Sequence, residues 1–525
     1  MQNRPIRFFH RGQIVEVKDA LPTRTVLDWL REDARCTGTK EGCNEGDCGA
    51  CTTVVGELTE PGDADAIRGL TLHTVNACIQ FLPALDGKAL FTVEDLESIR
   101  AGAAPAQTPS DPASAADALH PVQRAMVECH GSQCGFCTPG FVMSLWSSYE
   151  RNQACGARPT RQQLADELSG NLCRCTGYRP ILDAGQRMFE LPAAALDTAP
   201  AVAALQALRE DAGLAYEAGG ARFDAPRTLD ELADLRLARP GATLLAGSTD
   251  VGLWVTKLFR DLPDLIHLGA VAELKRIERR GDALHIGAGA SLEEAFRALV
   301  REWPSLEDVW LRFASVPIRN AGTMGGNVAN GSPIGDSAPV LMALDAVVEL
   351  RRGARVRSMA LADFYVDYMK NRLEPGEFVQ GLSVPLDTAA QVRAYKMSKR
   401  FDCDISSVCA GLAIELDGGV VSTVRFAFGG MAATVRRAAR AEAATLGQPW
   451  TEATLRAAQR ELGRDFTPLT DMRASAGYRT QVAQNLLRRF WLETRTTNPL
   501  TTSQLSVWSV MPHAALPAAL EGSAR

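Results

Sequence analysis

The distribution of cysteines constrains this 525-residue chain more than any other feature, because eleven of its 13 cysteines lie between Cys36 and Cys175. The other two, Cys403 and Cys409, lie far downstream. The start shows no apolar signal region and no apolar run is long enough to cross a bilayer, so we expect a cytoplasmic protein. Clustered cysteines in a reducing cytoplasm bind metal or do redox chemistry more often than they form disulfides. Metal chemistry is therefore expected in the first third of the chain.

The first set of cysteines has the plant-type spacing of a 2Fe–2S cluster: Cys43-x4-Cys48-x2-Cys51, followed by Cys78. Three thiolates on one tight loop must converge on two irons, and such a loop needs residues that tolerate positive φ. Gly42, Gly46 and Gly49 are available for this. Four thiolates also suit zinc, although the long gap to the fourth ligand fits zinc less well than paired CxxC knuckles would.

The second set joins a CxxC pair to a CxC pair: Cys134, Cys137, Cys173 and Cys175. A lone CxxC would equally suit a thioredoxin-like or a zinc site. The CxC pair lets neighbouring thiolates serve one cluster, and both pairs precede expected helix starts, at Thr138-Pro139 and at Thr176-Gly177. A helix N-terminus stabilises the negative charge of thiolates. The remaining cysteines are interpreted as small buried hydrophobes: Cys36, Cys129, Cys155, Cys403 and Cys409.

The first third of the chain is predicted to form two small domains. Residues 1–97 read as an α+β unit with a short helix capped by Thr25. Its strands are expected at 6–9, 13–17, 52–58 and 90–94. An Ala-, Pro- and Ser-rich linker over 101–118 leads to a helical domain over 119–190. Its helices are expected to begin at Thr138 and at the Thr160–Gln163 capping box.

A second linker is predicted over 191–215, followed by two modules with alternating strands and helices, over 216–388 and 390–500. The strands are expected at 243–246, 264–268, 407–416 and 424–428, and Ser291 with Glu294 forms a further capping box. The net charge is -6, with 56 basic and 62 acidic residues. This balance gives no basic footprint, so no nucleic-acid partner is expected.

The cysteine motifs resemble the iron–sulfur half of the molybdenum hydroxylases. The matching segments are "CNEGDCGACT" at 43–52, "NACIQ" at 76–80, "QCGFCTPGF" at 133–141 and "NLCRCTGYRPI" at 171–181. The resemblance implies a multidomain α+β fold: a plant-ferredoxin-like β-grasp domain, a helical 2Fe–2S domain and an α+β FAD-binding module with a C-terminal flavoprotein domain. It also implies that the CxxC…CxC cluster lies nearer molybdenum and the ferredoxin-like cluster nearer the flavin.

Three further segments are similar to the flavin-binding part of the same family: "LLAGSTDVG" at 244–252, "RNAGTMGGNVANGSPIGDSAPVLMALDA" at 319–346 and "FAFGGMA" at 426–432. A pyrophosphate needs hydrogen-bond donors and close backbone approach, which glycines permit. Alone, GSTD and GGN are typical of ordinary turns, and neither is a GxGxxG motif. The resemblance assigns FAD contacts to Leu244, Leu245, Ala246, Gly247, Ser248, Thr249, Asp250, Val251, Phe313, Thr323, Met324, Gly325, Gly326, Asn327, Asp336, Val379 and Lys396.

Several of these residues have alternative interpretations. Phe313 would lie beside the isoalloxazine, or be an ordinary core residue. Asp336 could be a helix cap and Lys396 a surface charge. The loop over 399–404 borders the flavin in relatives and affects access of NAD⁺, and an exposed Cys403 in this loop would be redox-sensitive.

No segment after residue 500 is long enough for the family's molybdenum region, so a partner carrying molybdopterin–molybdenum is expected, in an (αβ)₂ heterotetramer. The order of domains resembles the xanthine dehydrogenase branch of the family. The resemblance implies that electrons pass from the partner through both 2Fe–2S clusters to FAD and on to NAD⁺. The cofactors do this chemistry, so no acid–base residue is assigned. Two alternatives stay open: a hydroxylase of aldehydes or N-heterocycles, and a zinc-bound scaffold without catalysis.

Overall fold

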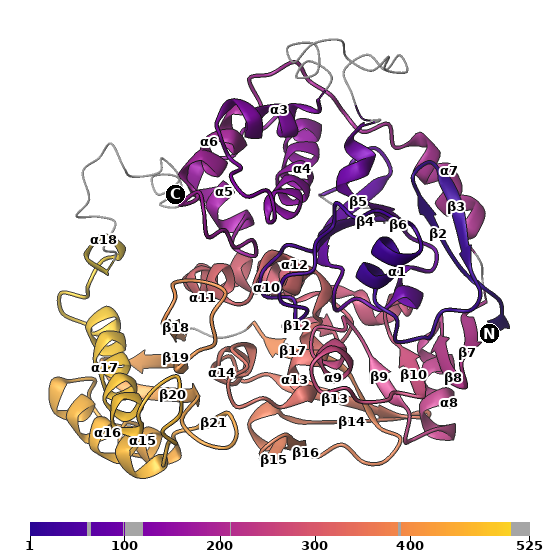
Figure 1. Ribbon diagram of the computed structural model, residues 1–525. Helices are drawn as coiled ribbons and strands as arrows, with labels where there is room; N and C mark the ends of the chain where they lie inside the picture. Colours follow the sequence, from indigo (N-terminus) through magenta and orange to yellow (C-terminus); the bar gives the residue numbers. More distant parts are fainter. Residues whose placement is uncertain (60–64, 98, 100–118, 210–211, 387–389, 506–525) are drawn as a thin grey trace.

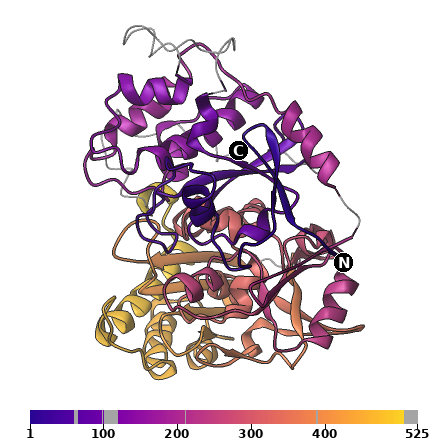
Figure 2. The same cartoon turned by 45° about the vertical axis from the view of Figure 1, so that its right-hand side comes forward.

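The computed structural model describes residues 1–59, 65–97, 99, 119–209, 212–386 and 390–505. The N-terminal half, up to residue 209, lies against the C-terminal half, which starts at residue 212 (Figure 1). A view turned by 45° keeps the same arrangement, with one half above the other (Figure 2). The linker expected over 101–118 lies outside the described residues.

The N-terminal half begins with a five-stranded mixed sheet in the order β3-β2-β6-β4-β5. Its strands are β2 (Ile6–His10), β3 (Gln13–Val17), β4 (Thr52–Leu58), β5 (Leu70–Asn76) and β6 (Ala89–Phe91). The strands predicted over 6–9 and 13–17 are confirmed and pair as an antiparallel hairpin, and β2 also pairs in parallel with β6. Helix α1 (Val26–Glu32) has the predicted cap, because Thr25 Oγ1 accepts from the Asp28 N–H at 3.1 Å.

The strand predicted over 90–94 is wrong beyond Phe91. Asp95 accepts a hydrogen bond from the Thr92 N–H at 2.7 Å, and this contact turns the chain into the 3₁₀ helix η2 (Val93–Glu97). A second 3₁₀ helix, η1 (Leu82–Leu85), precedes β6.

Four helices form the second unit: α3 (Pro121–Glu128), α4 (Thr138–Cys155), α5 (Arg161–Glu167) and α6 (Arg179–Arg187). The Thr160 capping box of α5 is confirmed. Helix α4 begins one residue away from its predicted cap, since Cys137 occupies the cap position and Pro139 the second helical position. Residues 140–150 of this helix are buried, and the centroid of the Trp146 ring lies 5.5 Å from that of Phe91 in the sheet. The two units therefore share one core.

One carboxyl group, that of Glu150, is buried on α4. It accepts the Leu196 N–H at 3.0 and 3.1 Å, and Arg68 Nη2 lies 3.3 Å away. Burial outweighs these contacts and raises the pKa of Glu150 to about 7. The folded protein thus holds this proton more tightly than the unfolded chain does. Its stability is expected to fall as the pH rises from the ordinary glutamate pKa through about 7.

Glu150→Gln removes this charge but keeps an oxygen that can accept from Leu196. We expect the variant to be more stable than the wild type by roughly 3 kcal/mol near pH 8, with the gain shrinking to about 1 kcal/mol near pH 5. Thermal unfolding at both pH values measures this. The exposed residue Glu190 supplies a matched control, Glu190→Gln, which should leave the pH profile unchanged. A lower Tm for Glu150→Gln at the higher pH would contradict the assignment.

The segment predicted as a linker over 191–215 contains a helix, α7 (Ala199–Leu208). Within this alanine-rich segment, Ala201, Leu205 and Leu208 have the i, i+4 and i+7 spacing of an apolar helix face. All three are buried in the shared core of the N-terminal half. The helix lies beside β2 and β4 and forms part of the N-terminal half (Figure 1).

The C-terminal half begins with a sheet in the order β1-β7-β8-β10-β9. Its edge strand β1 (Gln2–Asn3) is the start of the chain, so the N-terminus is paired into the C-terminal half. The other strands are β7 (Leu214–Ala218), β8 (Ala221–Ala225), β9 (Thr243–Leu245) and β10 (Asp264–His267). The connecting helices are α8 (Leu229–Ala238) and α9 (Val251–Thr256), and η3 (Ala272–Lys275) follows β10.

An antiparallel sheet follows, in the order β11-β12-β17-β13-β14. Its strands are β11 (Ile277–Arg280), β12 (Ala283–Gly287), β13 (Val347–Arg352), β14 (Arg355–Ala360) and β17 (Phe378–Pro385). The helices between them are α10 (Leu292–Glu302), η4 (Pro304–Leu306), α11 (Glu307–Arg312), α12 (Val316–Ala321), α13 (Met324–Asn330), α14 (Ser337–Ala343) and η5 (Leu361–Asp363). The Ser291 capping box of α10 is confirmed. A two-stranded ribbon joins β15 (Tyr365–Asp367) to β16 (Lys370–Asn371).

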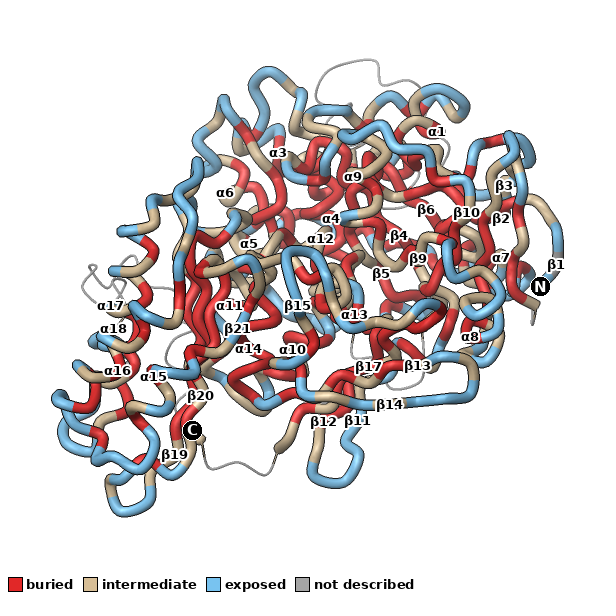
Figure 3. Tube along the Cα trace, turned by 90° about the horizontal axis from the view of Figure 1, so that it is seen from below, coloured by how far each residue is buried: buried red, intermediate tan, exposed pale blue. Residues whose placement is uncertain are grey.

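The last module packs helices on a four-stranded sheet, β18-β19-β20-β21. Its elements are β18 (Gln391–Met397), β19 (Val408–Asp417), β20 (Val420–Gly429), β21 (Arg436–Arg437), α15 (Ala439–Ala443), α16 (Glu452–Asp465), α17 (Ala476–Thr494) and α18 (Thr502–Leu505). Buried chain runs through the middle of the molecule near α4 and α12, whereas β14 and β15 are largely exposed (Figure 3). Within the described residues, none of the helices has the length and apolarity needed to span a membrane.

Candidate redox-cofactor sites

The first cysteine set lies where β4 and β5 meet the loop that precedes β4. Thr52 pairs with Asn76 across these antiparallel strands, and the Ala77 N–H donates to the Cys51 carbonyl at 3.2 Å. This pairing brings Cys51 beside Cys78, two residues beyond the end of β5. Strand register therefore places the distant fourth cysteine next to the loop.

The four thiols of the first set contact one another. Hydrogen bonds from the Cys48 and Cys78 thiols lower the pKa of Cys43, and a bond from Cys78 lowers that of Cys51. The backbone amides of Asp47 and Cys48 also point at the Cys43 sulfur, each at 3.3 Å. No disulfide joins these cysteines. Thiols together with inward-pointing amides fit the four-thiolate shell of a 2Fe–2S cluster.

Two of the three glycines in this loop have the expected backbone. Gly46 and Gly49 adopt φ values of +79° and +69°. Gly42 is required for a different reason, because a Cβ at this position would lie 2.7 Å from the Cys48 sulfur. The loop thus uses two glycines for conformation and one for space.

The second set lies between α3 and α4 and before α6. Its thiols make two contacts, Cys134 with Cys175 and Cys137 with Cys173. Burial and the Cys173 contact raise the pKa of Cys137 to about 12. Burial raises the pKa of Cys173 too, but the hydroxyl and amide of Thr176, with the amide N–H at 3.4 Å, outweigh it and lower that pKa. Cys134 and Cys175 are exposed, so this set lies at the surface.

The expectation that both pairs precede helix starts is only half correct. Cys137 is the cap residue of α4, but α6 begins at Arg179, after a turn in which Tyr178 has φ +69°. The Tyr178 hydroxyl instead accepts the Cys173 N–H at 3.0 Å. Among the described residues, no three Cys, His, Asp or Glu side chains surround a position for one metal ion. The thiols of the second set lie in two contacting pairs.

The two glycine-rich segments that the family resemblance assigns to FAD lie side by side. The first follows β9, and the second is the start of α13, where Thr323 Oγ1 accepts the Gly326 N–H at 3.1 Å. A Cβ at Gly326 would lie 3.8 Å from the Cβ of Ala246. The buried Ser248 hydroxyl has no partner among the described groups. A buried hydroxyl without a partner is costly, and a bound polar ligand would supply one.

Gly247 is the tightest point between these segments, since an added Cβ would lie 1.7 Å from the Ala321 carbonyl oxygen. Gly247→Ala must push the two segments apart, and we expect it to destabilise the chain by about 1–3 kcal/mol and to reduce bound flavin. Flavin content and thermal unfolding measure both effects. Gly241→Ala is the matched control, because nothing lies within 4 Å of its added Cβ. Full flavin occupancy in Gly247→Ala would show that the loop containing Gly247 is not part of the flavin site.

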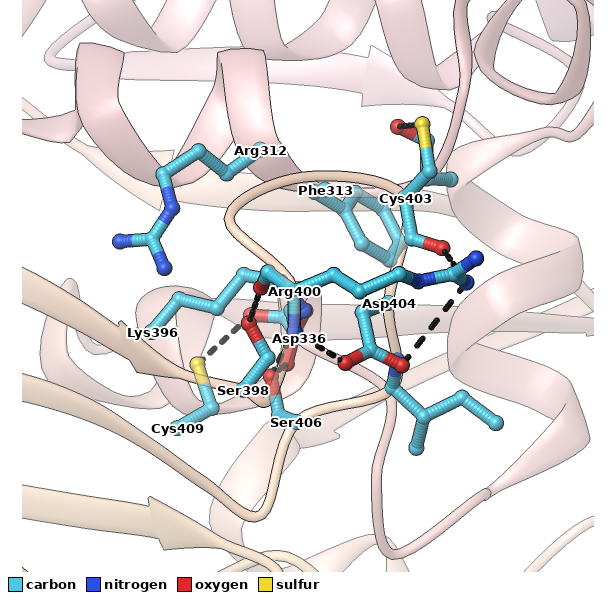
Figure 4. Close-up of polar contacts among 12 residues, drawn as sticks. Arg312, Phe313, Asp336, Lys396, Ser398, Arg400, Cys403, Asp404, Ser406 and Cys409 are labelled. Carbon is cyan, nitrogen blue, oxygen red and sulfur yellow. Dashed lines mark hydrogen bonds and ion pairs between the residues drawn. The ribbon is translucent and has the colours of Figure 1, made fainter. Parts of the chain in front are cut away.

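Asp336 and Lys396 form a buried ion pair at 2.6 Å (Figure 4). Ser406 joins them, because it accepts from Lys396 Nζ at 2.8 Å and donates to Asp336 at 2.6 Å. The hydroxyl of Ser337, the residue after Asp336, donates to Asn327 of the second glycine-rich segment. Asp336 does occupy the cap position of α14, but its side chain caps no backbone amide. Lys396 is buried and not a surface charge. Sequence reasoning missed Ser406, for which no local pattern gave a signal.

Phe313 and Val379 are both members of the large apolar core of the C-terminal half. Phe313 is 9% exposed, and its ring lies 5.5 Å from that of Phe296. Val379 lies on β17 opposite Leu350. Both side chains pack in this core, and their flavin contacts stay predictions.

The loop over 399–404 belongs to the C-terminal half of the molecule and contacts the N-terminal half. Arg400 lies 3.7 Å from Asp47 of the first cysteine loop, and the Cys403 thiol donates to the Ser169 carbonyl at 2.9 Å. Burial raises the pKa of Cys403 to about 11. A thiol with this pKa and a carbonyl partner is not the exposed, redox-sensitive group considered from the sequence. Arg312, which sequence reasoning missed, donates to the Phe401 carbonyl at 2.7 Å, and its guanidinium lies over the Phe401 ring, 4.7 Å from the ring centroid.

Four family profiles match the chain in order. They describe a 2Fe–2S iron–sulfur cluster binding domain at 8–81, a [2Fe–2S] binding domain at 108–186, an FAD binding domain in molybdopterin dehydrogenase at 220–387 and a CO dehydrogenase flavoprotein C-terminal domain at 393–494. The expected fold of a ferredoxin-like domain, a helical 2Fe–2S domain and a two-part flavin module is confirmed.

Curated relatives extend over most of the chain. A protein named xanthine dehydrogenase from Drosophila subobscura is 32% identical over 84% of this chain and 35% of its own length. A protein named aldehyde oxidase 4 from Cavia porcellus is 28% identical over 85% of this chain and 36% of its own length. The chain thus spans about a third of the length of these relatives. Among solved structures, carbon monoxide dehydrogenase from Hydrogenophaga pseudoflava matches with a TM-score of 0.48 and 28% identity, over 51% of this chain and 94% of that one.

Proposed function

This chain belongs to the molybdenum hydroxylase family, and we propose that it is the electron-transfer subunit of a xanthine dehydrogenase. In this proposal a partner subunit carries molybdopterin–molybdenum and oxidises hypoxanthine to xanthine and xanthine to urate. The bound clusters and flavin supply the redox chemistry, and NAD⁺ is the final acceptor. We place the partner in an (αβ)₂ assembly and the reaction in the cytoplasm, where thiols stay reduced.

The observation that carries this proposal is the match to a relative named xanthine dehydrogenase over 84% of the chain. The domain profiles and the contacts among thiols support the cofactor assignments. The chain's own residues have three tasks here. Eight cysteines hold the two clusters: Cys43, Cys48, Cys51, Cys78, Cys134, Cys137, Cys173 and Cys175. The paired glycine segments hold the flavin, and the loop over 399–404 borders it.

A second candidate is an iron–sulfur and flavin subunit of a hydroxylase that acts on aldehydes or N-heterocycles. The relative named aldehyde oxidase 4, which matches 85% of this chain, supports this second candidate. The substrate pocket would belong to the molybdenum subunit in either case, so the residues of this chain serve both candidates equally.

The decisive experiment is to co-express the chain with its molybdenum subunit and to follow NADH formation after adding xanthine. We expect xanthine-dependent NADH, and no NADH when either subunit is omitted. Oxidation of NADH by a dye without any response to xanthine would reject the purine assignment, and aldehydes and N-heterocycles would then be tried. A colourless preparation with stoichiometric zinc would reject the cluster assignment itself.

A further inference from the structure

Two buried polar residues lie at the base of the loop over 399–404. Strands β18 and β19 pair up to Met397, which lies opposite Val408, and the Ser407 N–H donates to the Met397 carbonyl at 2.7 Å. Lys396 lies near the end of β18, and Ser406 lies shortly before β19 begins. The two ends of the loop therefore meet beside these two side chains.

Ser406 completes a closed ring of hydrogen bonds with the ion pair (Figure 4). Its hydroxyl accepts from Lys396 Nζ at 2.8 Å and donates to Asp336 Oδ1 at 2.6 Å, while Nζ donates to Asp336 Oδ2 at 2.6 Å. The direction of the hydroxyl proton is fixed, because an ammonium only donates and a carboxylate only accepts. All three residues are at most 2% exposed, so bulk water does not compete for these contacts.

The ammonium of Lys396 has one donor left over. It carries three N–H groups, and Asp336 and Ser406 take two of them. Among the residues that the structure describes, Nζ has no third acceptor. The thiol of Cys409, opposite Lys396 in the sheet, stays neutral because burial raises its pKa well above the usual range. A buried donor without a partner is costly, so the third N–H calls for an acceptor that a ligand would supply.

The ring of hydrogen bonds borders a segment that is assigned to the flavin. Asp336 is the cap residue of α14, and the hydroxyl of the next residue, Ser337, donates to Asn327 of the second glycine-rich segment. A Cβ at Gly335 would lie 3.4 Å from Asn327 Oδ1. Lys396 is therefore linked to the glycine-rich segment through Asp336 and the residue that follows it.

We propose that Ser406 is a positioning residue for the bound flavin: it holds the ammonium of Lys396 with its third N–H toward the flavin and thereby raises the reduction potential of FAD. The proposal rests on the function proposed above. Electrons that enter a flavin bring negative charge onto the ring, and a fixed cation beside the ring favours the reduced form. Ser406 itself exchanges neither an electron nor a proton.

The loss of the hydroxyl would free one carboxylate oxygen. Asp336 Oδ1 accepts from Ser406, and without this donor it competes with the ligand for the ammonium. The third N–H would then turn from the flavin to the carboxylate. The effect of Ser406 on the flavin therefore passes entirely through Lys396, which makes it separable from an effect on folding.

The test measures the two-electron reduction potential of FAD in the full chain loaded with clusters and FAD, by equilibration with a reference dye. Ser406→Ala removes the hydroxyl and Ser406→Thr keeps it. Ser407→Ala is the matched control, because Ser407 is the next residue, is 4% exposed and makes no side-chain hydrogen bond with Lys396 or Asp336. The paramagnetic resonance of both clusters and thermal unfolding are recorded for every variant, since a merely structural defect would change them.

We expect Ser406→Ala to keep FAD and both cluster signals and to lower the ratio of reduced to oxidised flavin about 10-fold at a fixed potential, which is about 30 mV for a two-electron couple. Ser406→Thr and Ser407→Ala should stay close to the wild type. If the threonine variant does not fold, Ser406→Ala is repeated in a Lys396→Gln background, where it should shift the potential no further.

An unchanged potential in Ser406→Ala would overturn the proposal. So would a higher potential, which would show that the hydroxyl holds the ammonium away from the flavin. An equal shift in Ser407→Ala, or a full shift that persists in the Lys396→Gln background, would also overturn it. If the wild-type chain binds no FAD, the proposed function fails and this inference fails with it. Normal FAD binding with an unchanged potential in Ser406→Ala rejects this inference alone.

Discussion

Cys48→Ser is expected to remove the signal of the ferredoxin-like cluster and to abolish NAD⁺ reduction by the complete enzyme. The Cys48 thiol contacts Cys43, and its carbonyl accepts the Leu172 N–H, so this residue serves both its own loop and the junction with the second set. A serine hydroxyl has none of the thiolate character that an iron–sulfur ligand needs. The backbone bond to Leu172 is retained, so only the ligand is lost.

The measurement combines iron content, paramagnetic resonance and NADH formation with the molybdenum partner. Bound iron should fall by about half, because each cluster holds two irons on four cysteines. The partner should still reduce the remaining cluster. Cys155→Ser is the control. The sequence predicts a buried Cys155, but the structure shows it as an exposed free cysteine outside both sets. NAD⁺ reduction at full rate in Cys48→Ser would show that electrons bypass this cluster.

Asp336→Ala is expected to destabilise the chain by about 3–5 kcal/mol, because it leaves the Lys396 ammonium buried without its counter-charge. Among the residues that the structure describes, Ser406 is the remaining hydrogen-bond partner of Lys396 Nζ. Denaturant unfolding followed by circular dichroism measures the loss. Glu452→Ala is the control: it breaks an exposed ion pair with Arg456 at 2.7 Å, which is worth at most about 1 kcal/mol.

The double variant Asp336→Ala/Lys396→Met separates the structural role of the pair from a role in flavin binding. Replacing both charges by apolar groups should recover most of the lost stability. If the pair also contacts flavin, bound FAD should stay low although the fold is restored. Recovery of stability and FAD together would make the pair purely structural.

From the amino-acid sequence alone, we could predict those structural elements that depend on interactions between residues close together in the chain. The Thr25, Thr160 and Ser291 caps are present because each depends on residues within one helical turn. The same local reasoning failed at residues 93–97, where the Asp95 carboxylate redirects the backbone. It failed again at α7, whose alanine-rich composition concealed its apolar face.

The cysteine motifs also determined which residues belong together, since their spacing reflects the geometry of a cluster. Only the tertiary structure decided how the groups meet. The Lys396–Asp336 pair joins residues 60 positions apart, and Asn171 reaches Gly49 across 122 positions. Neither contact leaves a periodic pattern in the sequence, because each forms where elements that are distant in the chain pack together. Such contacts depend on the burial and register of whole domains, which no local pattern encodes.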